Sequence, residues 1–138
     1  MARNILGVVA GLVAWIAVVL VAGEIMRQSW PAYARVAAGM TFTLPMLFAR
    51  LGISVLATLT MGMVAALVSQ SMWTRLMPGV LLLAAFIPQH IMLWDKFPVW
   101  YHLTFLLTLV PLTYLGGMFA PPGNSRRNVV AAASSGRS

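Results

Sequence analysis

The sequence predicts an all-α fold: a polytopic membrane protein, built as a four-transmembrane-helix bundle with one interfacial amphipathic helix between helices 1 and 2. Two observations support this prediction. Hydrophobic residues make up 61% of the 138 residues and charged residues only 8%, whereas soluble domains carry about 25% charged residues. Four long apolar runs contain no Asp, Glu, Lys or Arg, and a spanning helix needs about 20 such residues.

Prolines mark the ends of the expected spans. Pro78 and Pro98 favour the first turns of the third and fourth spans, where a missing backbone N–H costs little. Pro121 and Pro122 end the fourth span, because proline cannot continue the helical hydrogen-bond ladder. The four spans are expected at residues 5–23, 51–72, 76–94 and 99–120.

The chain is expected to form a single transmembrane helical domain over residues 1–123. Residues 124–138 are rich in Ser, Ala, Asn and Arg and lack apolar periodicity. A segment of this composition buries too little apolar surface to form a packed fold. We therefore expect residues 124–138 to be a disordered cytoplasmic tail.

The segment between the first two spans, residues 31–49, is the hardest to assign. Its uncharged part, residues 36–49, is short for a span and typical of an interfacial piece. At 100° per residue, a polar stripe is formed by Arg35, Gly39, Thr43 and Arg50. We expect a helix lying in the membrane surface and kinked near Pro45. The alternative is a fifth span, which would move the C-terminus to the other side.

Basic residues predict the orientation, since cytoplasmic loops carry an excess of Lys and Arg. With the N-terminus in the cytoplasm, more basic residues fall inside than outside. The inner ones are Arg3, Arg75, Arg126, Arg127 and Arg137, and the outer ones are Arg27, Arg35, Arg50 and Lys96. We therefore expect a cell inner-membrane protein with both termini in the cytoplasm. The predominance of arginine over lysine, with abundant Ala, Val, Leu and Gly, indicates a bacterial source.

Tryptophan positions agree with these helix ends. Trp30, Trp94 and Trp100 fall at the outer interface and Trp73 at the inner one, as in an aromatic belt. Trp15 lies in the middle of the first span and is expected to pack inside the bundle or to face acyl chains. The net charge of +7 sits at the ends of apolar runs, which favours attraction to anionic lipid over a nucleic-acid partner.

Small residues predict where the helices pack, because helices in lipid associate through close approach and polar contacts. In the first span, Gly7 and Gly11 form a GxxxG pair that Ala14 continues. The other expected stripes are Thr58, Gly62, Ala65 and Ser69 in the second span, and Thr104, Thr108 and Pro111 in the fourth. Packing within one chain is favoured over a specific homodimer seam.

The few polar side chains gather near one membrane face in this arrangement. The candidate polar cluster consists of Glu24, His90, Asp95 and His102. Imidazole and carboxylate groups could bind a divalent metal, and two histidines on adjacent helices could ligate a haem from both sides. Ionisable groups inside a membrane also mark proton-coupled transport paths, for which Glu24 and His90 are the deepest candidates.

A purely structural interpretation explains the same residues. Asp95 is expected to cap the fourth helix, and Glu24 and Arg27 are partners three residues apart at a helix end. His90 and His102 would hydrogen-bond each other, water or lipid. This interpretation is favoured, and His90 is the residue to test first for any further role.

The sequence contains no motif for catalysis. It has no cysteine, which excludes thiolate nucleophiles and thiolate metal sites, and it lacks nucleotide-binding glycine loops. We expect no enzyme activity and no cofactor. The leading hypothesis is an accessory or scaffold subunit of a membrane complex, whose partners are the lipid bilayer and other membrane subunits or itself. The alternatives are a small oligomeric transporter or channel using Glu24, His90 and His102, and a metal- or haem-binding membrane protein.

Overall fold

The computed structural model describes residues 1–122 and confirms the predicted fold class. Within these residues the chain forms five helices and no strand: α1 (Ala2–Ser29), α2 (Pro31–Ala37), α3 (Leu44–Val68), α4 (Met72–Met92) and α5 (Val99–Met118). All except α2 are long and apolar enough to cross a membrane. At 1.5 Å per residue, even α5 with 20 residues reaches about 30 Å, the thickness of the hydrocarbon core.

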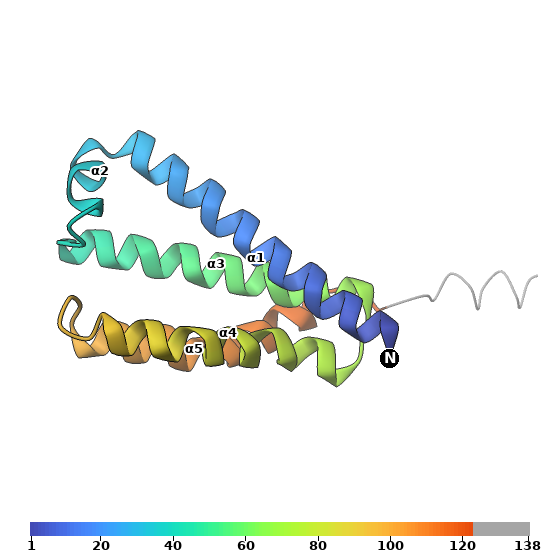
Figure 1. Cartoon of the computed structure of the whole chain (residues 1–138). Coiled ribbons are helices and arrows are strands. Elements are labelled where there is room, and N and C mark those ends of the chain that lie inside the picture. Colours follow the sequence, from blue (N-terminus) through green and yellow to red (C-terminus); the bar gives the residue numbers. More distant parts are fainter. Residues whose placement is uncertain (123–138) are drawn as a thin grey trace, which may run out of the picture.

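The N-terminal half of α1 packs tightly against α3, as the GxxxG pair predicted. A Cβ atom at Gly7 would lie 2.9 Å from the backbone oxygen of Ala65, and one at Gly11 would lie 2.8 Å from that of Met61. Beyond Trp15 no α1 residue is buried, and the helix diverges from α3 towards α2 (Figure 1). The close contact therefore covers only the first half of α1.

Glycines also bring α3 and α5 together. A Cβ atom at Gly62 would overlap the carbonyl group of Thr113, and one at Gly116 would overlap the carbonyl group of Leu59. Any side chain larger than hydrogen would force the two backbones apart. The stripe predicted for the second span, Thr58, Gly62, Ala65 and Ser69, is buried throughout. Gly62 faces α5, whereas Thr58, Ala65 and Ser69 contact α1.

The stripe predicted for the fourth span is wrong. Thr104 and Pro111 are exposed, whereas Leu109 and Thr113 are fully buried. The Thr108 hydroxyl donates to the backbone oxygen of Thr104 in its own helix at 2.7 Å. That bond satisfies the hydroxyl within α5, so Thr108 needs no partner on another helix. The buried face of α5 is instead the one that carries Gly116, where the backbones come close.

The segment expected as one interfacial helix over residues 31–49 is divided. Helix α2 covers only Pro31–Ala37, and α3 already begins at Leu44. Between them Met40 has a φ of 54°, a left-handed conformation that interrupts helical pairing. Pro45 lies in the first turn of α3, where proline is favoured, and does not kink a surface helix. No fifth span forms in this part of the described chain.

This division changes the place of Arg50. The predicted surface stripe of Arg35, Gly39, Thr43 and Arg50 does not exist, because its members belong to different elements. Arg50 lies inside α3, and α2 is held at the end of the bundle by aromatic contacts. Tyr33 stacks on Phe42 with ring centroids 5.1 Å apart, and Phe42 stacks on Phe97 of the α4–α5 turn at 6.0 Å.

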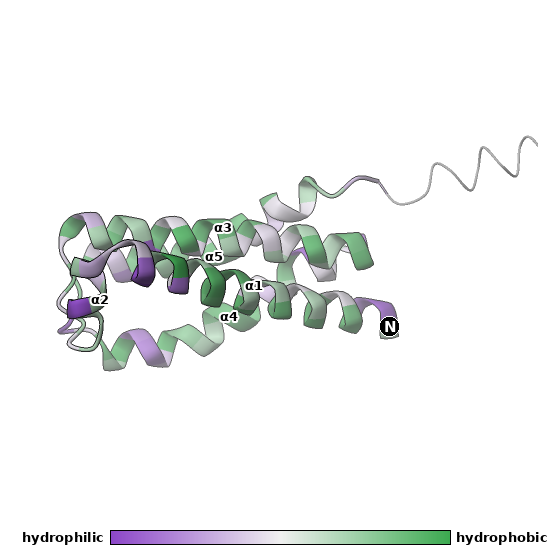
Figure 2. Cartoon of the chain, turned by 90° about the horizontal axis from the view of Figure 1, so that it is seen from above, coloured by the Kyte–Doolittle hydropathy of each residue, from purple (hydrophilic) through white to green (hydrophobic). Residues whose placement is uncertain are grey.

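Several helix ends differ from the apolar runs. Helix α1 extends to Ser29, beyond the expected end at residue 23, and α3 and α4 each begin and end before the expected spans. Pro78 is therefore inside α4 instead of in its first turn. Hydropathy marks where a helix enters lipid, but a helix can continue into the interface. Figure 2 shows hydrophilic positions near α2 and the adjacent end of α1.

The expectation of a disordered cytoplasmic tail over residues 124–138 lies outside the described residues.

Candidate functional site

His90 of α4 and His102 of α5 form a buried pair. Their Nδ1 atoms are 2.7 Å apart, and the exposed fractions are 8% for His90 and 0% for His102. One Nδ1 must donate a proton and the other must accept it. At least one ring is therefore neutral. The expectation that these two histidines hydrogen-bond each other is confirmed.

Aromatic rings enclose this pair. Trp94 stacks on His102 at a centroid distance of 4.8 Å, and Phe105 stacks on His90 at the same distance. The other nitrogen of His102, Nε2, is buried and has no hydrogen-bond partner within residues 1–122. The surroundings are those of a packed joint between α4 and α5 near their connecting turn.

The geometry of the pair does not match a metal or haem centre. Two nitrogen ligands at about 2.0–2.1 Å from one tetrahedral ion lie about 3.3 Å apart, farther than the 2.7 Å between these atoms. Haem ligation needs the imidazoles on opposite faces of the iron. Two rings that are hydrogen-bonded to each other leave no room for an iron between them. The described residues contain no group of three or more His, Asp and Glu side chains that could hold an ion.

The other two members of the candidate polar cluster do not join the histidines. Glu24 is exposed on α1, where it accepts a hydrogen bond from Gln28 at 3.0 Å and lies 3.7 Å from Arg27. Asp95 is exposed in the α4–α5 turn. It is not the cap of α5, because Pro98 occupies that position. Of the three residues named for a transport path, His90 and His102 are thus in contact, and Glu24 does not join them.

A charged side chain that sequence reasoning did not select lies inside the bundle. The Arg50 guanidinium donates from Nη1 to the hydroxyl of Tyr33 at 2.7 Å and from Nε to that of Tyr101 at 3.4 Å. Its carbon Cζ lies 4.6 Å from the centre of the Phe42 ring, a cation–π distance. The sequence signal was Pro45: a helix that starts there places Arg50 more than one turn inside α3.

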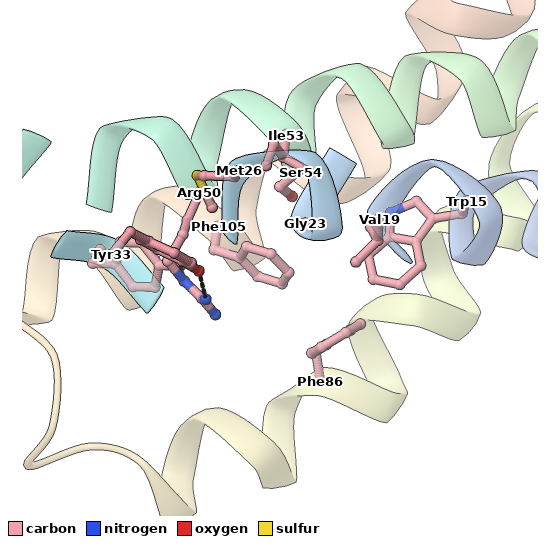
Figure 3. A pocket seen from close by; sticks show the side chains of 11 residues that line it. Trp15, Val19, Gly23, Met26, Tyr33, Arg50, Ile53, Ser54, Phe86 and Phe105 are labelled. Carbon is pink, nitrogen blue, oxygen red and sulfur yellow. Dashed lines mark hydrogen bonds between the residues drawn. The ribbon is translucent and has the colours of Figure 1, made fainter. Parts of the chain in front are cut away.

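Arg50 lies at one end of a half-open cavity of ≈ 180 Å³ (Figure 3). Four helices contribute its mostly apolar walls, and Tyr33 of α2 lies beside Arg50. The lining residues are Trp15, Val19, Gly23, Met26, Tyr33, Arg50, Ile53, Ser54, Phe86, Tyr101 and Phe105. The cavity combines a cationic end with an apolar interior.

A second hollow, a groove of ≈ 410 Å³, lies on another flank of α1. Its lining is entirely apolar and consists of Ala17, Val18, Val21, Ala22, Ile25 and Leu56. It follows the part of α1 that has left α3. Two sites thus adjoin the C-terminal half of α1: a cationic cavity and an apolar groove.

Comparisons with protein-family models, with curated proteins and with solved structures find no match to this chain.

Proposed function

We propose that this chain is a non-catalytic accessory subunit of a membrane complex, and that it holds one transmembrane helix of a partner protein in the groove between α1 and α3. The groove is the observation that supports the proposal. Five of its six lining residues come from the half of α1 that has no fully buried residue.

The composition of the groove favours a helix as its occupant. Ala17 and Ala22 are small and let another backbone come close, and close approach is what drives helix association in lipid. The part of α1 without a fully buried residue runs from residue 16 to residue 29, nearly four helical turns. A non-catalytic role is supported by the buried His90–His102 pair, whose facing nitrogens are engaged with each other.

We further propose that the protein resides in a bacterial inner membrane with both termini in the cytoplasm. Four crossings return the chain to its starting side. Arg50 lies inside α3 and Arg75 lies inside α4, so each side has one loop charge fewer than the sequence suggested. The N-terminal side keeps an excess of one basic residue, which supports this orientation.

Purification from native membranes in mild detergent tests the proposed function. The expected result is a complex that contains a second protein and is heavier than the copies of the 14.9 kDa chain in it. Ala22→Phe fills the groove and should remove that protein. Leu20→Phe is the matched control, because Leu20 is exposed on α1 but lines neither hollow, and it should leave the complex intact.

Three outcomes contradict the proposal. One is a monomer with no second protein. Another is a homo-oligomer, which would mean that a further copy of this chain occupies the groove. The third is a partner that Ala22→Phe and Leu20→Phe affect equally, because the groove would then not be the docking site.

A further inference from the structure

We propose that the Arg50 cavity binds an anionic phospholipid, with the guanidinium on the headgroup phosphate and one acyl chain along the apolar wall. This site uses a different set of residues from the helix-docking groove, so either assignment can fail without the other.

The charge of Arg50 is not balanced by the protein. The chain has only two acidic side chains. Glu24 is exposed and lies beside Arg27, and Asp95 is exposed and forms no ion pair within residues 1–122. The partners of Arg50 are neutral tyrosine hydroxyls, which orient the guanidinium without neutralising it. A cation in a membrane-spanning helix calls for an anion, and here it has to come from outside the chain.

The guanidinium keeps donors available for that anion. Of its five N–H groups, one on Nη1 and the one on Nε point to Tyr33 and Tyr101. The remaining donors include both N–H groups of Nη2, which form no hydrogen bond within residues 1–122. The two tyrosines are only 4% and 5% exposed, so they hold the planar group in one orientation. An oriented guanidinium suits an oxyanion with two acceptor oxygens.

The walls of the cavity suit a hydrocarbon chain. Trp15, Val19, Met26, Phe86 and Phe105 form an apolar surface that runs inward from the cation. A volume of ≈ 180 Å³ is too small for a whole two-chain lipid. It can hold a stretch of one chain beneath the headgroup, while the rest of the lipid stays in the bilayer, because the cavity is half open. A free inorganic anion would leave this apolar wall unused.

The depth of Arg50 matches a headgroup phosphate. It follows Leu44 by six residues, about 9 Å along the helix. Helix α3 is about 37 Å long against a hydrocarbon core of about 30 Å. A centred α3 therefore places the Arg50 backbone about 5 Å inside the hydrocarbon boundary, and the long side chain can reach the interface.

Native mass spectrometry of protein reconstituted in nanodiscs tests this proposal. The nanodiscs contain equal amounts of phosphatidylglycerol and phosphatidylcholine, and the measured quantity is the lipid retained after release. We expect one retained phosphatidylglycerol and a preference over phosphatidylcholine. Arg50→Gln should weaken retention about 10- to 100-fold, as expected for a charge-assisted hydrogen-bonded contact. Arg35→Gln is the matched control, since Arg35 is an exposed cation on α2, and it should retain the lipid.

A second pair of variants leaves Arg50 untouched. A Cβ atom at Gly23 meets nothing within 4 Å, and Gly23 lines the cavity, so Gly23→Leu extends into the cavity space and should also reduce retention. Gly52→Leu is its control, because Gly52 is equally open but lies outside the cavity. Equal retention of both lipids, or retention unchanged in Arg50→Gln and Gly23→Leu, overturns the proposal. Displacement of the lipid by millimolar inorganic phosphate also overturns it, because the site would then take a free anion.

Discussion

At the scale of single residues, the bond between His90 and His102 is a buried polar contact between α4 and α5. Both rings are almost fully buried and surrounded by aromatic groups. In such surroundings a hydrogen bond is worth most when the alternative is an unpaired polar atom. The removal of either ring therefore costs more than its apolar contacts alone.

A double-mutant cycle measures this contribution. His90→Ala and His102→Ala should each destabilise the protein, and the double variant should cost less than the sum. We expect a coupling energy of about 0.5–3 kcal/mol, measured as the free energy of unfolding by steric trapping. His90→Ala with Leu103→Ala is the control cycle, because Leu103 is exposed beside His102, and these two changes should add. Strict additivity in both cycles would show that the histidine pair contributes no specific bond.

At the scale of helices, glycines decide how near the elements come. Gly62 and Gly116 face each other's helix so closely that a methyl group would overlap a carbonyl group. Gly52, on the same helix as Gly62, is exposed and has open space around its Cβ position. The seam between α3 and α5 therefore depends on the position of glycine and not on the glycine content of α3.

Alanine substitutions separate the two kinds of glycine. Gly62→Ala should destabilise the protein by about 1–3 kcal/mol, because the added methyl forces α3 and α5 apart. Gly52→Ala should stay within about 0.5 kcal/mol of the natural sequence, as an exposed substitution. The free energy of unfolding in bicelles checks both values. Equal effects would mean that the α3–α5 seam yields without cost.

At the scale of the whole molecule, the even number of spans places the start of α1 and the end of α5 at the same end of the bundle (Figure 1). The opposite end carries α2, the α4–α5 turn and the aromatic contacts between them. The cavity of Arg50 adjoins that second end. The bundle is thus closed tightly near its termini and opens where α1 leaves α3.

Cysteine labelling checks the orientation, and the chain has no cysteine of its own. Single cysteines at Thr41 and Asp95 should react with a membrane-impermeant maleimide in spheroplasts. Cysteines at Ala2 and Met72, at the other end of the bundle, should react only after permeabilisation. The reversed pattern would contradict cytoplasmic termini, and different accessibility of Thr41 and Asp95 would contradict the four-span arrangement.

Part of the candidate site could be predicted from the sequence. The adjacent ends of two consecutive helices with a short turn place His90 near His102, and the structure confirms their bond. Glu24 was grouped with them because it lies near the same side of the membrane. Whether its side chain points into the bundle depends on the tilt and rotation of α1, and it is exposed. Arg50 was misplaced because the polar stripe of Arg35, Gly39, Thr43 and Arg50 assumed one continuous helix. Pro45 and the left-handed Met40 divide that segment.

The sequence by itself determined the class of the protein, the number of spans and the tight contact at Gly7 and Gly11, because apolar length and small-residue spacing are local properties. Only the tertiary structure decided where α1 leaves α3, which face of α5 is buried, and what surrounds Arg50. These features depend on how close helices distant in sequence can approach. For α3 and α5, that approach is set by backbone contacts at Gly62 and Gly116, which no hydropathy pattern records.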